Sequence, residues 1–318
     1  MKKQVIVLVV LAAFLVAGCA GLAGLFAKKT GEEVTFWDPA LLSNVRRITN
    51  DGLFKDWANI SPDGAKLIYC EREKADGLWN IVLLRDVNSP ARTTLIKDGA
   101  FAPAWYENSN TFIYGIWEDD SYKLIRSTIS GGGKTYVTRN TDGELWPSVR
   151  ESIVLCNTWS DEPLKRQLVS MRDNGNEYTI LGEGYSASWH PIENKFLFIR
   201  QGNIYEMDVE TTQVSELYND PDGYNCAQPR YSGDGQYILF QKGAEAKVTG
   251  TRGKKAVVSK KSKWQIYYMK ADGTGLSPLT GGNVNATSPS WDKNNNVYFV
   301  SDANGKYEVY QARINIIE

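Results

Sequence analysis

Residues 60–69 read Ile-Ser-Pro-Asp-Gly-Ala-Lys-Leu-Ile-Tyr: a large apolar residue, a four-residue turn and an apolar strand. In such a turn, proline presets φ, aspartate accepts hydrogen bonds from the turn backbone, and glycine takes a positive φ. Residues 231–240, Tyr-Ser-Gly-Asp-Gly-Gln-Tyr-Ile-Leu-Phe, repeat the same layout. Two strands joined by a tight turn are therefore predicted in at least two places.

Internal repetition extends this unit over most of the chain. Aligned on the large apolar residue before the turn, the sequence contains six copies at spacings of 45, 41, 43, 42 and 60 residues. The aligned residues are Ile60, Trp105, Trp146, Trp189, Tyr231 and Trp291. Another large apolar residue follows nine residues later, or one residue early in the last copy: Tyr69, Tyr114, Leu155, Phe198, Phe240 and Phe299. A fixed period of this length predicts a repeat fold.

Two further short β-rich runs complete each copy. The third runs are residues 80–82, 123–125, 167–169, 203–205, 265–267 and 308–310. The fourth runs are residues 47–49, 94–96, 136–138, 179–181, 215–217 and 278–280. Four short strands in about 42 residues are typical of one blade of a β-propeller. The sequence therefore predicts an all-β fold, a six-bladed β-propeller of four-stranded antiparallel blades.

The phase of the repeat also predicts how the ring closes. The chain opens with an isolated fourth-type strand at residues 46–49 and ends on a third-type strand at residues 308–314. We expect the N-terminal strand to join the last blade, because closure removes the exposed strand edges that invite aggregation. One helical turn is expected at residues 38–42, Asp-Pro-Ala-Leu-Leu, with aspartate as N-cap and proline at the first helical position.

The repeat resembles a known propeller family. The motif stands here as Ile60-Ser61-Pro62-Asp63-Gly64 followed by Leu67-Ile68-Tyr69, and in the fifth copy as Tyr231-Ser232-Gly233-Asp234-Gly235, then Ile266-Tyr267, Asp272-Gly273 and Leu279-Thr280. This order looks like the WD40-like repeat of the TolB-type propellers. The resemblance covers residues 46–314, with the turn motif decayed in the other copies, and it concerns the propeller domain alone.

The first residues are predicted to be a targeting segment. Lys2 and Lys3 precede an apolar run over residues 5–16, which is the layout of a secretory signal. Val16-Ala17-Gly18-Cys19 resembles a bacterial lipobox, and that resemblance implies cleavage before Cys19 and lipid attachment to its sulfur. We expect a signal peptide at 1–18, a lipid-anchored tether at 19–33 and the propeller at 34–318. The alternative is an uncleaved transmembrane helix over residues 4–27.

Both interpretations place the folded part outside the cytoplasm. Two or three acyl chains anchor a protein stably, because each buried methylene contributes ~0.8 kcal/mol. In the lipoprotein family, an aspartate after the lipidated cysteine tends to retain the protein at the inner membrane, and this sequence has Ala20 there instead. The resemblance therefore implies the outer membrane if the host is Gram-negative.

The sequence offers little for catalysis. The single histidine, His190, falls in the turn of the fourth copy, where other copies carry Ser61 or Ser232. A Ser-His-Asp mechanism needs a histidine to accept the serine proton, and the sequence has no Gly-x-Ser-x-Gly motif. It also has no Cys-x-x-Cys pair or zinc-ligand spacing. We therefore expect no enzyme activity, no metal and no cofactor.

The cysteines other than Cys19 are expected to be buried free thiols. Cys70 and Cys156 align at equivalent second-strand positions of copies one and three, so a whole blade would separate them. A disulfide requires Cα atoms about 5–6 Å apart. With Cys226 the count is odd, and a buried free thiol packs as a small apolar group.

Two charged features are candidate binding sites. Acidic residues in the loops that enter the innermost strands are expected to ring one mouth of the channel: Asp51, Asp98, Asp142, Glu183 and Asp222. An insertion at residues 242–263 carries eight basic residues against one acid, a net charge of +7. Its candidate contacts with an acidic partner are Lys247, Arg252, Lys254, Lys255, Lys260, Lys261 and Lys263. Turn chemistry for the first feature and solvated charge for the second are the simpler alternatives, and both stay open.

Three functions follow, in decreasing order of support. The first is a non-catalytic, lipid-anchored envelope propeller that acts as a scaffold for other envelope proteins. The second is a propeller that binds a glycan or small ligand at the channel mouth through aromatic loop residues: Phe54, Trp57, Phe101, Trp117, Trp159, Tyr185 and Tyr224. The last is a metal-dependent lyase, which a single histidine disfavours. A formal net charge of −1 gives no reason to expect nucleic acid as a partner.

Overall fold

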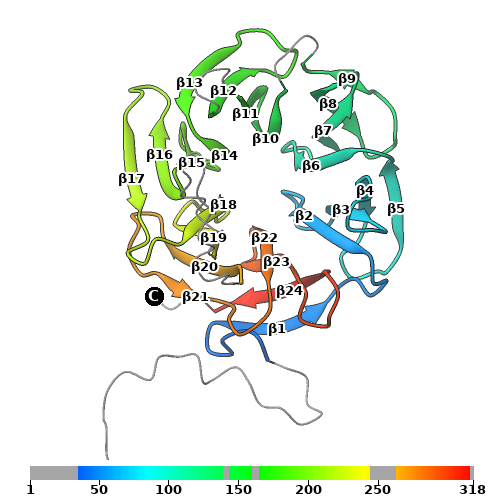
Figure 1. Ribbon diagram of the computed structural model, residues 1–318, viewed down its shortest axis with the longest axis vertical. Helices are drawn as coiled ribbons and strands as arrows, with labels where there is room; N and C mark the ends of the chain where they lie inside the picture. Colours follow the sequence, from blue (N-terminus) through cyan, green and yellow to red (C-terminus); the bar gives the residue numbers. More distant parts are fainter. Residues whose placement is uncertain (1–34, 139–142, 160–164, 244–262, 316–318) are drawn as a thin grey trace, which may run out of the picture.

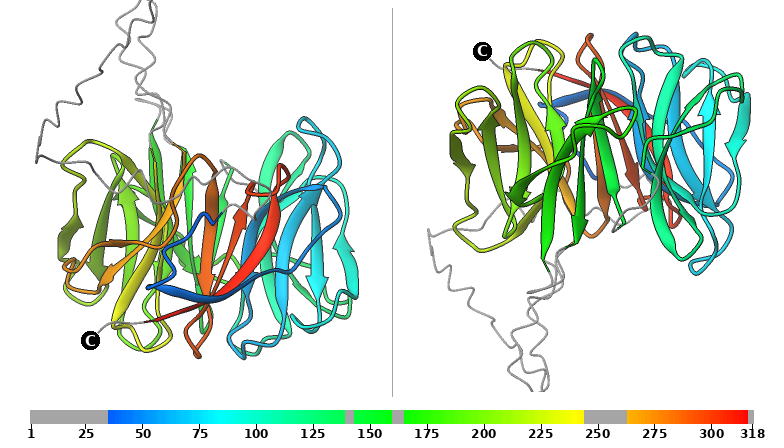
Figure 2. Two further views of the ribbon diagram at one scale, coloured as in Figure 1. Left: turned by 90° about the horizontal axis from the view of Figure 1, so that it is seen from below. Right: turned by 90° about the horizontal axis from the view of Figure 1, so that it is seen from above.

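The computed structural model describes residues 35–138, 143–159, 165–243 and 263–315. They form six four-stranded antiparallel sheets arranged around a central axis, so the expected six-bladed β-propeller is confirmed (Figure 1). The sheets stand side by side and twisted around the ring when the molecule is viewed from its edge (Figure 2). None of the described residues forms a helix long and apolar enough to span a bilayer.

Each blade runs from an innermost strand at the axis to an outermost strand at the rim. Blade one comprises β2 (Phe54–Ile60), β3 (Leu67–Arg72), β4 (Asn80–Leu84) and β5 (Arg92–Ile96). Blade two comprises β6 (Ala100–Trp105), β7 (Thr111–Glu118), β8 (Ser121–Thr128) and β9 (Thr135–Tyr136). Blade three comprises β10 (Leu145–Arg150), β11 (Ile153–Trp159), β12 (Arg166–Arg172) and β13 (Thr179–Glu183).

The remaining blades follow the same plan. Blade four comprises β14 (Tyr185–Trp189), β15 (Lys195–Arg200), β16 (Asn203–Asp208) and β17 (Val214–Tyr218). Blade five comprises β18 (Asn225–Tyr231), β19 (Tyr237–Gly243), β20 (Gln265–Lys270) and β21 (Ser277–Pro278). Blade six comprises β22 (Ala286–Trp291), β23 (Asn296–Ser301), β24 (Glu308–Ile314) and the N-terminal strand β1 (Leu42–Arg47).

The N-terminal strand closes the ring as expected. β1 pairs antiparallel with β24, from Leu42 opposite Ile314 to Arg47 opposite Tyr310. The strand begins four residues earlier than the sequence predicts. At the place of the expected helical turn, residues 38–42 form one hydrogen-bonded turn and no helix longer than that: the carbonyl of Asp38 accepts from the N–H groups of Leu41 at 3.1 Å and Leu42 at 2.8 Å. Asp38 caps this turn as expected, since its Oδ1 accepts from the backbone N–H of Ala40 at 2.8 Å. The chain goes straight from the turn into β1, where pairing with β24 takes over the backbone hydrogen bonds.

The residues before β1 extend the closure to blade five. The Phe36 ring is buried and meets the Tyr310 ring edge to face, at 5.3 Å between centroids. Trp37 forms an isolated bridge with Thr280, and the N–H of Asp38 donates to the carbonyl of Leu279 at 3.1 Å. The N-terminal segment therefore ties the last two blades together.

The hydrophobic core lies between neighbouring blades. One cluster joins blades six and one through buried side chains such as Tyr69, Val82, Tyr298 and Val309. A second cluster of buried side chains, which includes Ile113, joins blades two and three. Facing sheets pack their large side chains together at the density of a protein interior, so each blade is stabilised by its two neighbours.

The strand register corrects one position of the sequence alignment. Ile60 and Trp105 lie opposite Leu67 and Phe112, directly beside the turn between first and second strands. In blade three, that place belongs to Val149, which lies opposite Val154, and not to Trp146. The alignment on Trp146 is therefore three residues early, because an indole three residues away matches the apolar pattern as well as Val149 does.

The corrected alignment also changes the position to which Cys156 is equivalent. Cys156 is the second residue after Val154, as Tyr69 is after Leu67, so it matches Tyr69 and not Cys70. The free thiols of Cys70, Cys156 and Cys226 are buried. Burial raises the pKa of the Cys226 thiol to about 12. All three cysteines therefore behave as apolar core residues.

His190 has a structural role in the turn between β14 and β15. Its backbone N–H donates to Lys195, as that of Ser61 does to Lys66 and that of Ser232 to Tyr237. The His190 ring is buried, and its Nδ1 accepts from the backbone N–H of Glu193 at 2.8 Å. Burial lowers the pKa of the imidazole. This histidine therefore caps a turn, which is the role that its place in the repeat predicts.

Candidate ligand-binding site in the central channel

All six innermost strands carry a β-bulge at the same height in the channel. In each of them, pairing with the next strand skips two residues, and the first of the two has a positive φ of 48–56°. These residues are Trp57, Ala102, Trp146, Ser186, Gln228 and Ser288. A left-handed conformation is costly for residues other than glycine, and bulges next to functional sites redirect side chains. The bulges therefore turn a ring of side chains toward the axis.

Prolines mark four of these bulges. The second bulge residue is Pro103, Pro147, Pro229 or Pro289 in four blades, and Ala58 or Ala187 in the other two. Proline donates no hydrogen bond, so within a sheet it is confined to edges, strand starts and bulges. A proline inside an innermost strand could thus have marked the channel wall in the sequence. The alignment of the repeats did not take these prolines into account.

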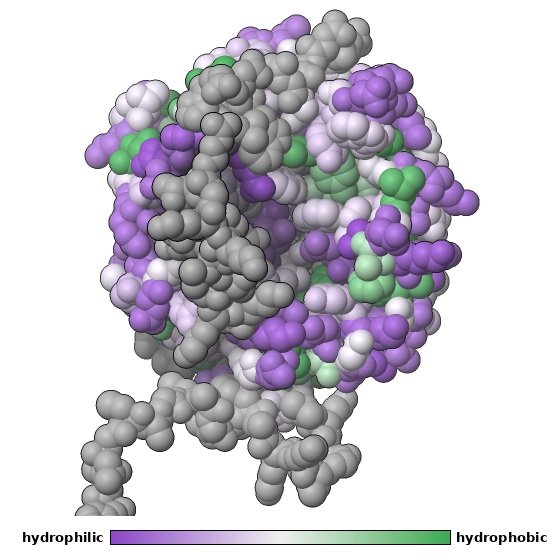
Figure 3. Space-filling model, in the orientation of Figure 1, coloured by the Kyte–Doolittle hydropathy of each residue, from purple (hydrophilic) through white to green (hydrophobic). Residues whose placement is uncertain are grey.

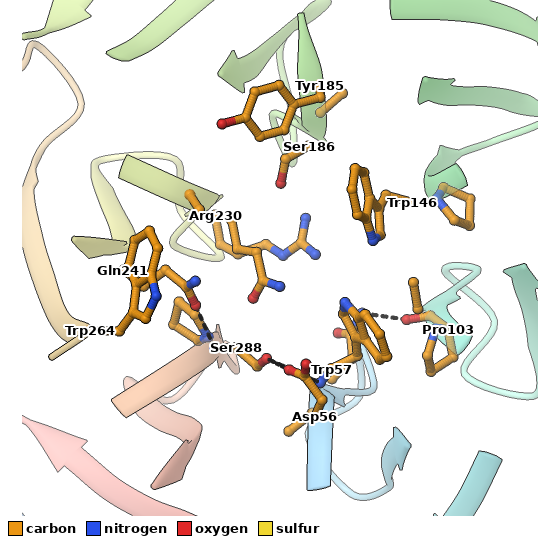
Figure 4. Close-up of a pocket in the computed structure, with 18 of the residues that line it drawn as sticks. Asp56, Trp57, Pro103, Trp146, Tyr185, Ser186, Arg230, Gln241, Trp264 and Ser288 are labelled. Carbon is orange, nitrogen blue, oxygen red and sulfur yellow. Dashed lines mark hydrogen bonds between the residues drawn. The ribbon is translucent and has the colours of Figure 1, made fainter. Parts of the chain in front are cut away.

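The bulged strands enclose a cavity of about 270 Å³. The hollow lies at the centre of the face seen in Figure 3, where polar and apolar residues meet. Three indoles and one phenol contribute aromatic surface to its wall, from Trp57, Trp146, Trp264 and Tyr185. Figure 4 shows these rings around the cavity, with Trp57 and Trp146 facing the same central space as Arg230. The channel therefore offers aromatic faces from four blades to one small volume.

Two arginines line the cavity in different ways. The guanidinium of Arg166 lies 4.5 Å from the centre of the Trp146 ring and 4.6 Å from that of Tyr185. Arg230, on β18, projects into the middle of the cavity (Figure 4). Burial lowers the pKa of Arg230 to about 10, and no charge among the described residues offsets this effect. Arg230 is half-buried in the cavity, and its guanidinium stays cationic at neutral pH.

One carboxyl group, that of Asp56, belongs to the described wall. Its Oδ1 accepts from the hydroxyl of Ser288 and from the backbone N–H of Trp57, the latter at 2.8 Å. The N–H of Ser288 in turn donates to Gln241 Oε1 at 2.8 Å, which links blades one, six and five. Burial raises the pKa of Asp56 although these hydrogen bonds lower it. The carboxyl group of Asp56 is therefore occupied by hydrogen bonds within the wall.

The predicted acidic ring does not form the cavity wall. Asp51 pairs with Lys55 and with Arg92, the latter at 2.6 Å. Glu183 pairs with Lys165 at 3.1 Å. Asp98 and Asp222 are exposed, and Asp142 lies outside the described residues. None of the four described carboxylates lines the cavity, so their role at the channel mouth stays a prediction.

Other predicted site residues lie largely outside the described part of the chain. These are Cys19 and, from the basic insertion, Lys247, Arg252, Lys254, Lys255, Lys260 and Lys261. Lys263 is described, with its Nζ 3.8 Å from a carboxylate oxygen of Asp302. Within the described ranges, no three His, Cys, Asp or Glu side chains are grouped to hold a metal ion.

The aromatic residues proposed to bind a glycan divide into two sets. Trp57 and Tyr185 line the cavity. Phe101 is buried in the core between blades one and two, and Phe54 stacks on Tyr307 at 6.2 Å. Trp117 is 49% exposed and lies outside the cavity wall, as does Tyr224. The side chain of Trp159 is not described. The sequence thus found two of the aromatic wall residues, Trp57 and Tyr185, and missed Trp146 and Trp264 as members of the same wall.

No protein-family model and no curated protein matches the sequence. Solved structures match the fold. TolB from Acinetobacter baumannii is 14% identical, with 80% of this chain and 66% of that chain covered and a TM-score of 0.57. A gluconolactonase from Xanthomonas campestris is 9% identical, with 87% and 92% covered and a TM-score of 0.63. An oligogalacturonate lyase in complex with manganese is 14% identical, with 85% and 93% covered and a TM-score of 0.55.

Identities this low establish the fold alone. The chain is a six-bladed β-propeller structurally similar to the propeller of TolB, and the same fold is shared by enzymes, a lactonase and a lyase.

Proposed function

We propose that this protein is a non-catalytic binding propeller whose central channel holds a small ligand. The observation that supports the proposal is the cavity of about 270 Å³, walled by bulged strands that present Trp57, Trp146 and Tyr185. Pockets for drug-sized ligands are typically about 300–1,000 Å³. The channel therefore suits a single ring, such as one sugar unit of a glycan, or the end of a longer molecule.

The composition of the wall supports binding without catalysis. General acid–base catalysis needs a group positioned to give or take a proton. The described wall contains one carboxyl group and neither histidine nor cysteine. That carboxyl group, on Asp56, already accepts two hydrogen bonds from its neighbours. The side chains that face open space are aromatic rings, amides and arginines, which recognise ligands.

Replacing Trp146 tests the channel as the binding site. We expect glucose, N-acetylglucosamine or glucuronate to change the tryptophan fluorescence of the wild-type protein, because three indoles line the cavity. Trp146→Ala should weaken that binding about tenfold or more, since an aromatic contact is worth ~0.5–1.5 kcal/mol beyond the area that it buries. Trp117→Ala is the matched control, because Trp117 is exposed outside the cavity wall. Equal affinity of the two variants would contradict the proposal.

A protein-binding role at the membrane is a second candidate, favoured by the charge of the insertion. Residues 242–263 carry a net charge of +7 in a chain of net charge −1. In this proposal a lipid on Cys19 holds the propeller at the outer membrane, and the insertion contacts an acidic envelope protein. The acidic loops would add a second contact surface.

The insertion can be tested in cells. We expect the protein isolated from membranes to carry envelope proteins that are lost when residues 244–262 are deleted, as identified by crosslinking and mass spectrometry. The Cys19→Ser variant should no longer be found in the membrane fraction, because the substitution removes the site of lipid attachment. An unchanged set of bound proteins would remove the insertion from this proposal.

A further inference from the structure

The repeat does not explain the arginine at the channel centre. Arg230 is the first residue of β18 to pair again after its bulge. The other five inner strands carry a short residue at this place: Asn59, Ala104, Ser148, Ser188 and Ser290. Two of these hold neighbouring blades together, since Ser148 Oγ accepts from the N–H of Trp189 and Ser290 Oγ from that of Ile60. A short side chain meets the needs of the fold here, so the arginine has another use.

The guanidinium of Arg230 has no partner within the described part of the chain. No hydrogen bond, ion pair or ring contact joins it to any described residue. Asp56, the carboxyl group of the wall, is bonded to Ser288 and Trp57 instead. A cation withdrawn from bulk water without a counter-charge is costly. A planar anion that accepts two parallel N–H bonds would offset that cost.

The surroundings of Arg230 favour a ring that carries hydroxyl groups. The rings of Trp57 and Trp146 face the same space as the guanidinium (Figure 4). Asn225 and Gln228, on the same strand β18, line the cavity with side-chain amides that bond to no described residue. Aromatic faces pack against apolar ring surfaces, and amides both donate to and accept from hydroxyl groups.

Resting on the proposed function, we propose that the channel binds a small sugar acid. Arg230 holds its carboxylate, the indoles of Trp57 and Trp146 flank its ring, and the amides of Asn225 and Gln228 bond its hydroxyl groups. A volume of about 270 Å³ limits the bound part to one sugar ring.

The test compares charged and neutral probes on matched variants. Calorimetric titrations at pH 7 use glucuronate, glucose and acetate against the wild-type protein, Arg230→Gln and Arg200→Gln. Arg200 is the matched control, because its guanidinium stacks on Tyr205 at 4.1 Å and does not line the cavity. We expect glucuronate to bind at least tenfold more tightly than glucose or acetate. Arg230→Gln should lose about 10- to 100-fold in glucuronate affinity, the loss expected for charge-assisted hydrogen bonds, and Arg200→Gln should lose none.

Thermal unfolding separates recognition from a structural role. Arg230→Gln should melt at the wild-type temperature or above it, because it removes a half-buried cation that has no counter-charge among the described residues. A lowered melting temperature would make Arg230 a structural residue and overturn the proposal. Equal binding of glucose and glucuronate, unaffected by Arg230→Gln, would overturn the sugar-acid proposal and leave the ligand channel standing. Acetate binding as tightly as glucuronate would also overturn it. If no probe binds and Trp146→Ala changes nothing, both proposals fail.

Discussion

A chain that begins at residue 48 is expected to lose most of the stability of one that begins at residue 34. The shorter chain lacks β1 and the residues before it, including the buried side chains of Phe36, Leu41 and Leu42. Burial of each large apolar side chain contributes ~1.5–3 kcal/mol, so the three together account for about 5–9 kcal/mol. Whole domains are stable by only about 5–15 kcal/mol. The ring should therefore open or unfold.

Guanidinium unfolding of both chains measures this effect, and light scattering gives an independent readout. Without β1, the edge of β24 from Tyr310 to Ile314 is unpaired, and exposed edges pair with other molecules. We expect the shorter chain to scatter light in a concentration-dependent way. Deletion of residues 244–262 from the longer chain is the control, because the other copies of the repeat do without this insertion and its removal should be tolerated. Equal unfolding midpoints for the two chains would show that the ring does not depend on its closing strand.

Removal of a buried carboxylate at the closure has the second largest expected effect. Glu308 is 1% exposed, and the side chain of Lys55, 3.2 Å away, is fully buried. The same carboxylate accepts from the Thr49 hydroxyl at 2.5 Å and from the N–H of Gly52 at 2.8 Å. Glu308→Leu leaves the Thr49 and Gly52 donors without this acceptor, and Lys55 keeps Asp51 as its one carboxylate partner among the described residues, with the carbonyl of Leu53 at 3.1 Å. We expect a loss of about 3–5 kcal/mol in the free energy of unfolding, typical of a broken buried pair.

A double variant and a surface control make this prediction specific. Lys55→Met combined with Glu308→Leu should recover part of the loss, because an apolar pair replaces a buried cation that has lost one of its two carboxylate partners. Glu177→Leu removes the exposed pair with Arg172, whose atoms are 3.0 Å apart, and should cost about 1 kcal/mol or less. If Glu308→Leu costs no more than Glu177→Leu, or if the double variant recovers nothing, the network does not stabilise the closure.

The number of blades and the closure could be predicted because they depend on local patterns. Turn residues such as Pro62 and Gly64, and apolar runs such as residues 67–69, fix where strands begin and turn. Six copies of the repeat, together with a first strand that has no partner in its own copy, then predict a six-bladed ring that this strand closes. The alignment failed at Trp146, because this indole lies three residues before Val149 and matches the apolar pattern equally well, and only the register of β10 with β11 separates the two.

The candidate site was decided by the tertiary structure. Trp57, Trp146, Tyr185 and Arg230 come from four blades, and only the ring brings them around one cavity. The sequence singled out Trp57 and Tyr185 only as two of seven candidate aromatic residues, and it offered no reason to select Trp146 or Arg230, whose inner-strand positions also suit plain blade packing. Whether Arg230 has a counter-charge depends on every side chain that the ring places near it. The sequence alone determined the six blades and their closure, because strands and turns follow local chemistry. The channel wall, with a cation that has no partner among the described residues, was decided only by the tertiary structure, because it depends on contacts between blades far apart in the chain.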